Sequence, residues 1–349
     1  MSGAASRRWR TGSQPLLWPA LALAALLAIN ALFDHGFLVI SWRAGHLSGS
    51  LVDVLNRAAP LALVASGMTL VIALRGIDIS VGAVLAIAAT VAALVINGSS
   101  AAAATGGGPH LAVALSAALA AAALCGLWNG LLVVGAGLQP IVATLVLMVA
   151  GRGAAQLLAG GQIITIYNAS YADLGNGFLL GVPIAVVVAA AIVLLLAVTL
   201  RCTALDLFIR AIGCNPAAAR NAGIRAGLIT MSCYVFCALC AGCAGVLVSA
   251  NVRSADASHA GELIELDAIL AVTLGGTSLA GGHYSLAGTL IGALIIQTMT
   301  AMIYTLGVPP ETNLVVKAAV VIAVMLLQSP HVRRGLRRLA TRHVLGEGA

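Results

Sequence analysis

The side chains of this chain that could carry out chemistry are few, and they form no catalytic pattern. No phosphate-binding G-x-x-x-x-G-K-[ST] sequence, no zinc-binding H-E-x-x-H sequence and no nucleophile elbow occurs. Cys233, Cys237, Cys240 and Cys243 follow one another at spacings of four, three and three residues. That spacing could suit a metal ion, but in an apolar helix cysteine is a small packing side chain. We therefore expect no catalytic residue, no metal site and no cofactor, and any ATP must be bound by another subunit.

The composition of the chain places it in a membrane. Of its 349 residues, 61% are hydrophobic and only 8% are charged, which leaves too little charge to cover a soluble protein of this size. Apolar runs of about twenty residues are long enough to cross a bilayer, whereas a membrane β-barrel would show short alternating segments. The sequence predicts an all-α polytopic membrane protein. We assign the net charge of +7 to topology and expect no nucleic-acid partner, because no soluble domain is available to carry a basic patch.

The apolar runs predict about ten transmembrane helices. The basic N-terminus and the run after it resemble a secretory signal, but the run is long and a cleavage site is poor, so we interpret it as an uncleaved span. The eighth span is the shortest of the ten. The predicted spans are residues 16–33, 54–74, 79–96, 110–134, 138–158, 179–200, 226–250, 268–279, 285–306 and 313–328.

Ten spans put both ends of the chain on one side of the membrane. Thirteen of the eighteen basic residues then fall on that side, and positively charged segments stay in the cytoplasm. We therefore predict cytoplasmic N- and C-termini. The chain divides into a basic cytosolic N-terminus (1–15), a first membrane half (16–200), a cytosolic loop (201–225), a second membrane half (226–328) and a basic cytosolic tail (329–349).

The cytosolic loop between the two halves contains a predicted helix. Asn215 can cap a helix by accepting from first-turn N–H groups. Pro216 fits the first helical position, and Gly223 suits the left-handed residue beyond the end. We predict a break over residues 212–216 and a short helix over 216–222. A loop that only reverses the chain could be shorter, so it is either a solvated connector or a docking helix for a cytosolic partner.

Charged side chains at membrane depth have two interpretations. Arg152 lies in the fifth predicted span, Lys317 in the tenth, and Asp267 at the start of the eighth. Such charges usually face a partner or a water-filled cavity. Either they form internal ion pairs that fix helix packing, or they line an aqueous translocation path together with Gln156, Gln297 and Asn129.

The turn between the second and third predicted spans also has two interpretations. Arg75 and Asp78 could form a local ion pair while Asp78 caps the helix that follows. Alternatively, Gly76, Asp78 and Ser80 form a hinge or gate, and the glycines Gly275 and Gly276 raise the same question near the end of the eighth span.

Several stretches resemble the permease subunits of ribose-type bacterial ABC importers. These are Gly67-Met-Thr-Leu-Val-Ile, Gly76-Ile-Asp-Ile-Ser-Val-Gly-Ala-Val and Ala211-Ile-Gly-Cys-Asn-Pro-Ala-Ala-Ala-Arg-Asn-Ala-Gly-Ile. The resemblance extends over about residues 50–330. Within the family, residues 53–60, 148–153, 265–272 and 316–321 most resemble galactofuranose permeases.

The resemblance implies the membrane subunit of an ATP-driven sugar importer that works by alternating access in the bacterial inner membrane. It implies a separate ATP-binding subunit, an extracytoplasmic sugar-binding protein and a second permease chain, identical or paralogous. The segment that contacts the ATPase corresponds to residues 211–223. The predicted coupling residues are Arg210, Ala211, Gly213, Asn215, Pro216, Arg220 and Gly223.

One departure from the family pattern concerns Arg75, which stands where a small residue is expected before the Gly-Ile-Asp sequence. If that position lines the path, the cargo could differ. Galactofuranose is the first expectation, with ribose, a nucleoside or autoinducer-2 as alternatives for the same machine. The alternative of another class is a secondary transporter or channel that works without an ATPase, in which case the central loop only connects the two halves.

Overall fold

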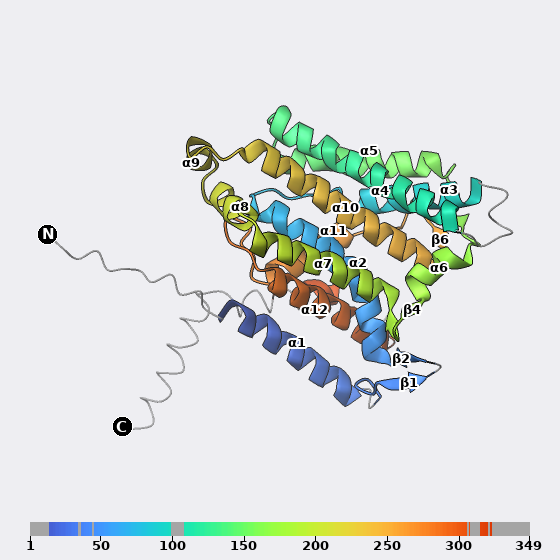
Figure 1. The fold of residues 1–349 in the computed structure, drawn as a ribbon. Coiled ribbons are helices and arrows are strands. Elements are labelled where there is room, and N and C mark those ends of the chain that lie inside the picture. Colours follow the sequence, from blue (N-terminus) through green and yellow to red (C-terminus); the bar gives the residue numbers. More distant parts are fainter. Residues whose placement is uncertain are drawn as a thin grey trace, which may run out of the picture.

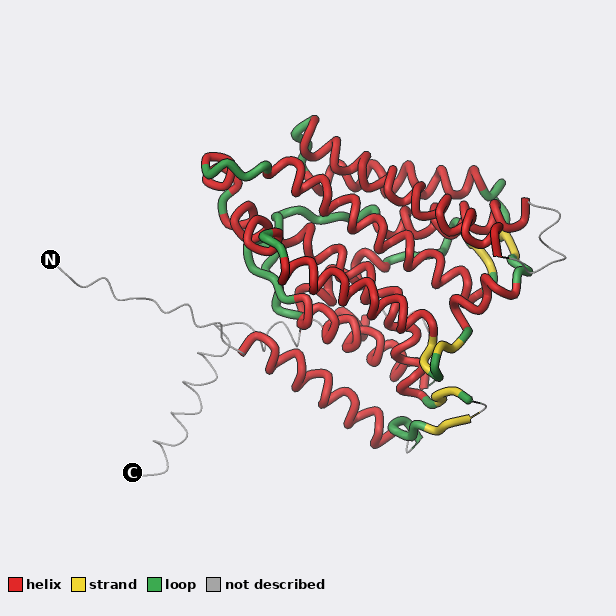
Figure 2. Tube along the Cα trace, viewed as in Figure 1, coloured by secondary structure: helices red, strands yellow, loops and turns green. Residues whose placement is uncertain are grey.

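Long, roughly aligned helices make up most of the molecule (Figures 1 and 2). The computed structural model describes residues 14–33, 36–43, 45–98, 108–305, 307, 315–319 and 322. Within them, eight helical segments are long and apolar enough to cross a membrane, which confirms the all-α polytopic fold. They are α1 (Gln14–Phe33), α2 (Ser50–Ala73), α3 (Val81–Gly98), α4 (Gly108–Gly130) with the π-helical turn η1 (Leu131–Gly135), α5 (Pro140–Leu158), α7 (Ile184–Cys202), α10 (Ala226–Val252) and α12 (Leu286–Thr305).

Shorter elements complete the fold. The short helices are α6 (Ala169–Asn176), α8 (Leu205–Cys214), α9 (Pro216–Asn221) and α11 (Ile264–Leu274). One of them, α11, packs inside the bundle against α2 and α12 (Figure 1). Antiparallel strand pairs are formed by β1 (Ser41–Arg43) with β2 (His46–Ser48), by β3 (Ile164–Thr165) with β6 (Ser254–Ala255), and by β4 (Phe178–Leu179) with β5 (Val182–Pro183).

The expected eighth span is not a full span. Residues 268–279 were predicted to form it, but α11 begins four residues earlier, at Ile264, has 11 residues and ends at Leu274. At 1.5 Å per residue it is about 16 Å long, roughly half of a hydrocarbon core of about 30 Å. Three of the glycines that follow, Gly276, Gly281 and Gly282, have positive φ angles of 85°, 79° and 75°, so the chain turns sharply before α12 begins.

The tenth predicted span, 313–328, lies outside the described residues except for 315–319 and 322. The two basic termini, 1–13 and 329–349, also lie outside them.

The core forms where α2 and α10 pack against each other. Almost every residue of α2 from Leu61 to Ala73 is buried. Glycine permits the close approach, because a Cβ at Gly67 would lie 2.7 Å from the Cα of Cys237, and small residues let membrane helices pack closely. Cys233, Cys237 and Cys240 are buried in α10, Cys243 is partly buried, and all four pack against apolar side chains.

The two ends of the bundle differ in their charge and in their elements. At one end lie α8, α9, η1 and the turn before α12 (Figure 1). Because the loop 201–225 contributes four arginines there, we call it the basic end. At the opposite end lie α6 and the strand pairs, and the Leu47 N–H donates to the Gly181 carbonyl at 2.9 Å.

Candidate functional site

The predicted helix in the central loop is present as α9. The Asn215 side-chain oxygen accepts hydrogen bonds from the N–H groups of Ala217 and Ala218, both at 3.1 Å. Pro216 occupies the first helical position, and Gly223 follows the helix with a φ of 82°. All three residues therefore have the local roles that their types predicted.

The loop also contains a second helix, α8, which the sequence analysis missed. The predicted break over residues 212–216 is narrower than expected, because α8 continues to Cys214 and only Asn215 separates it from α9. On α8, Ile209 and Ile212 are buried while Leu207 is exposed. The spacing of Leu205, Ile209 and Ile212 is that of an amphipathic helix, and it could have identified α8.

Three segments far apart in the sequence meet at the end of α8. A Cβ at Gly213 would lie 2.0 Å from the Ala73 carbonyl oxygen and 2.4 Å from the backbone nitrogen of Gly282. The Gly282 N–H donates to the same Ala73 carbonyl at 2.8 Å. The α2 terminus, the α8 terminus and the turn before α12 therefore pack backbone against backbone, with no room for a side chain at position 213.

Arg75 ties the same segments together through hydrogen bonds. Its Nε donates to the Gly213 carbonyl and its guanidinium Nη2 to the Cys214 carbonyl, both at 2.5 Å. Carbonyls in the last turn of a helix lack intrahelical partners and favour a cation. The expected local ion pair between Arg75 and Asp78 is therefore wrong. We call Ala73, Arg75, Gly213, Cys214 and Gly282 the coupling junction.

The side chains of α8 attach it to the turn before α12 as well. Asp206 pairs with Arg210 at 2.8 Å and accepts a hydrogen bond from the Tyr284 hydroxyl at 2.5 Å. The Arg210 guanidinium lies 4.5 Å from the centre of the Tyr284 ring. Burial, together with the Asp206 carboxylate, holds the pKa of Tyr284 well above its usual value, so the hydroxyl remains a donor at neutral pH.

The turn after Arg75 is organised by a buried carboxyl group. The Asp78 Oδ1 accepts from the Ser80 N–H at 3.0 Å and from its hydroxyl at 2.6 Å, just before α3 begins. Asn129 of α4 donates to the Ser80 hydroxyl oxygen at 2.8 Å. Ser80 precedes the first residue of α3, and Asp78 accepts no hydrogen bond from a first-turn N–H of that helix. The capping role predicted for Asp78 is therefore not observed, and its carboxyl group stabilises the turn before the helix instead. Asn129, proposed for the path, lies in this network.

The glycines proposed as hinges occupy crowded positions. A Cβ at Gly76 would lie 2.6 Å from the Tyr234 hydroxyl, and one at Gly275 would lie 2.3 Å from the carbonyl carbon of Gly288. Gly276 has a positive φ of 85°. These contacts explain why glycine is needed at Gly76 and Gly275, and a gating role for Gly76, Asp78, Ser80, Gly275 and Gly276 remains a prediction.

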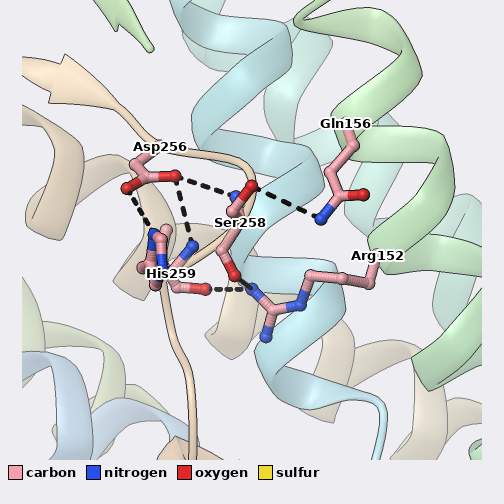
Figure 3. Close-up of polar contacts among 6 residues, drawn as sticks. Arg152, Gln156, Asp256, Ser258 and His259 are labelled. Atoms are coloured by element: carbon pink, nitrogen blue, oxygen red, sulfur yellow. Dashed lines mark hydrogen bonds and ion pairs between the residues drawn. The ribbon is translucent and has the colours of Figure 1, made fainter. Parts of the chain in front are cut away.

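Toward the opposite end, two of the predicted path residues reach from α5 to the segment before α11 (Figure 3). Arg152 donates to the carbonyls of Ser258 at 3.3 Å and Ala260 at 2.6 Å, and Gln156 donates to the Ser258 hydroxyl oxygen at 3.4 Å. Asp256 accepts from the N–H of Ser258 at 2.9 Å and pairs with the His259 ring at 2.9 Å. A polar patch thus forms between α5 and residues 256–260.

The other predicted path residues lie elsewhere. Asp267 pairs with Lys317 at 2.7 Å, and the side chains are 23% and 12% exposed, so the expected internal ion pair is confirmed for Lys317. Gln297 lines a separate cavity of about 280 Å³. Sequence reasoning missed the polar side chains that share this cavity, because they come from distant helices. They are Asn56, Arg57, Asn251, Thr300 and Tyr304.

The fold and the site define a class of protein, a membrane-embedded transport subunit without a nucleotide-binding sequence of its own. The model for the permease component of branched-chain amino acid transport systems matches residues 50–325. The chain belongs to this permease family, and its family resemblance is confirmed.

The chain is similar to several sugar permeases along most of its length. It is 48% identical over 323 residues to the galactofuranose transporter permease protein of Escherichia coli strain K12, which covers 92% of this chain and 91% of the relative. It is 38% identical to the fructose import permease protein of Bifidobacterium longum, over 92% of this chain and 89% of the relative. The ribose import permease protein of Escherichia coli strain K12 is 37% identical, over 88% and 92%. No solved structure matches the chain.

Proposed function

We propose that this chain is the membrane-spanning subunit of an ATP-driven sugar importer, with galactofuranose as its cargo. The choice of galactofuranose rests on the 48% identity to a galactofuranose permease, compared with 38% and 37% for the fructose and ribose permeases. The family model is named for branched-chain amino acids, but these three relatives are named for sugars. A small cavity with several uncharged polar side chains also suits hydroxyl groups, which exchange water for side-chain hydrogen bonds.

The partner that supplies the energy docks on α8 and α9. The coupling residues Arg210, Ala211, Gly213, Asn215, Pro216, Arg220 and Gly223 all lie on these two helices or at their ends. Arg220 is exposed on α9 and bonds only its own helix, at the Pro216 carbonyl, among the described residues, so its guanidinium remains accessible to an ATP-binding subunit. Arg210 is half-buried and acts by holding α8 in place.

The geometry supports alternating access driven from this loop. A displacement of α8 acts on α2 and α3 through Arg75, and on α12 through Gly282 and Tyr284. Both connections are made of hydrogen bonds and backbone packing, so we expect a movement of α8 to move α2, α3 and α12 as well. ATP binding by the partner would thus change the side to which the path opens, and the chain itself performs no covalent chemistry.

The remaining partners and the topology follow the same proposal. The basic end faces the cytoplasm, which places both termini there in a bacterial inner membrane. The opposite end receives the sugar-binding protein, and a second permease chain, identical or paralogous, completes the complex. Arg152, Gln156, Asp267, Gln297 and Lys317 are proposed to border the path.

Uptake into proteoliposomes tests the proposal. They contain this chain, its ATP-binding subunit, the second permease chain and the binding protein, with labelled galactofuranose or ribose outside. We expect galactofuranose to accumulate only when the ATP-binding subunit is supplied with ATP. Accumulation of ribose instead would correct the cargo, and flux in the absence of the ATP-binding subunit would replace the importer by a secondary transporter or channel.

A further inference from the structure

A long groove lies over α2 between α7 and α12. It has a volume of about 1050 Å³. On α7 its lining runs from Val186 to Arg201, a length of about 22 Å at 1.5 Å per residue. That exceeds half of a hydrocarbon core of about 30 Å, so the groove extends through more than one leaflet of the bilayer.

Small side chains make this surface hollow. α2 packs against both α7 and α12, but alanines line the groove where larger side chains would fill the space. Ala58, Ala59 and Ala62 line it on α2, and Ala189, Ala190 and Ala197 line it on α7. Leucine and valine side chains complete an apolar wall, which suits hydrocarbon and offers no hydrogen bond to a sugar.

The polar residues of the groove are all at the basic end. They are Arg201, Thr203, Asp206, Arg210, Tyr284 and Ser285. The residues that line the rest of the groove are apolar. The groove therefore has the polarity of an amphiphile, with one polar end and a long apolar body.

The charges at the polar end favour an anion. Asp206 is already paired with Arg210, which leaves Arg201 as the uncompensated charge. Arg201 is exposed and has no hydrogen bond or ion pair within the described part of the chain. Basic pockets between membrane helices on the cytoplasmic side bind anionic lipid head groups.

We infer that this groove binds one anionic phospholipid of the cytoplasmic leaflet, with its phosphate at Arg201 and an acyl chain along Ala190 and Ala197. A second copy of this chain fits the groove less well. Two copies inserted in the same direction place their basic ends side by side, so the copy would bring like charge toward Arg201. The inference is independent of the sugar that the protein carries.

Native mass spectrometry of the purified full chain tests this site, with dioleoylphosphatidylglycerol compared with dioleoylphosphatidylcholine. We expect one phosphatidylglycerol per chain to bind about fivefold more tightly than phosphatidylcholine, which corresponds to ~1 kcal/mol for one basic residue beside an anionic lipid. Arg201→Gln should remove this preference. Arg225→Gln is the matched control, because Arg225 is exposed at the same end but does not line the groove.

A second pair of variants tests the apolar body of the groove. Ala190→Phe should lower the occupancy of both lipids, whereas Ala191→Phe, on an exposed residue beside the groove, should not. Equal binding of the two lipids to the unmodified chain, or equal effects of the two arginine variants, would overturn the inference. So would release of the lipid by inorganic phosphate, or an Ala190→Phe variant that splits a dimer while its lipid occupancy is unchanged.

Discussion

Arg75 has a left-handed backbone conformation, which residues with a Cβ rarely adopt. The hydrogen bonds of its side chain explain why it adopts this conformation here. Its φ is 66°, in the left-handed region, which costs roughly 1–2 kcal/mol for a residue with a Cβ. The guanidinium offsets this cost with hydrogen bonds to Gly213 and Cys214. Any small residue, as expected for the family, would lose both bonds, and only glycine would also relieve the backbone. The residue therefore connects the α2–α3 turn to the loop 201–225.

Replacing Arg75 should separate ATP hydrolysis from transport. We expect Arg75→Ala to lower sugar uptake on the order of tenfold while ATP hydrolysis continues, since coupling free energies are typically 1–3 kcal/mol. Arg75→Gly removes the same bonds but adopts a positive φ freely. It should therefore be more stable than Arg75→Ala and equally uncoupled. Uptake and hydrolysis are measured together in proteoliposomes, and uptake at the unmodified level in both variants would refute a coupling role.

Three glycines near the basic end differ in whether an added Cβ would meet other atoms and in whether the backbone φ is positive. Alanine at each position therefore tests these two causes of destabilisation separately. Gly213 has no room for a Cβ, Gly223 has room but a φ of 82°, and Gly135 has room and no positive φ. We expect Gly213→Ala to disrupt the coupling junction, Gly223→Ala to cost about 1 kcal/mol, and Gly135→Ala to be neutral. Thermal unfolding in detergent should rank them in that order. Equal melting temperatures for the Gly213 and Gly135 variants would show that the junction is loosely packed.

At the scale of the elements, α9 depends on its cap more than on its length. A helix of six residues is too short to be stable alone, so the two hydrogen bonds to Asn215 fix where it begins. Asn215→Ala should cost about 1 kcal/mol of local stability and weaken binding of the ATP-binding subunit, whereas Asn215→Asp should retain the cap. Hydrogen exchange at Ala217 and Ala218 reports the cap directly. Unchanged exchange in the alanine variant would show that tertiary contacts hold α9.

The elements also show which features a sequence can predict. The spans follow from apolar runs, and α9 follows from Asn215, Pro216 and Gly223, because these depend on neighbours in the chain. The prediction for α11 was displaced toward the C-terminus, because Glu265 and Asp267 were assigned to a loop although they lie in the first turn of the helix, where acidic side chains are favoured. The partners of Arg75 lie 138 and 139 residues away, and the cavity around Gln297 gathers side chains from several helices. Such contacts are set by packing, which no local pattern encodes.

For the whole molecule, the pair of Asp267 with Lys317 links α11 to residues near the C-terminal end of the family match. The pair is partly buried, and removal of one partner leaves an uncompensated charge in a poorly solvated place. Breaking a buried pair costs about 3–5 kcal/mol, while replacing both partners is often nearly neutral. This pair is partly exposed, so we expect the lower part of that range at most.

The pair could fix helix packing or line the path, and these two roles predict different behaviour for a variant in which both residues are replaced by alanine. If the pair only fixes helix packing, Asp267→Ala and Lys317→Ala should each destabilise the protein, and the double variant should recover both stability and uptake. If the side chains line the path, the double variant should fold well and transport poorly. Thermal unfolding and galactofuranose uptake, measured on all three variants, distinguish these outcomes. We expect recovery of stability without recovery of uptake, because the pair is only partly buried and lies where the path is proposed.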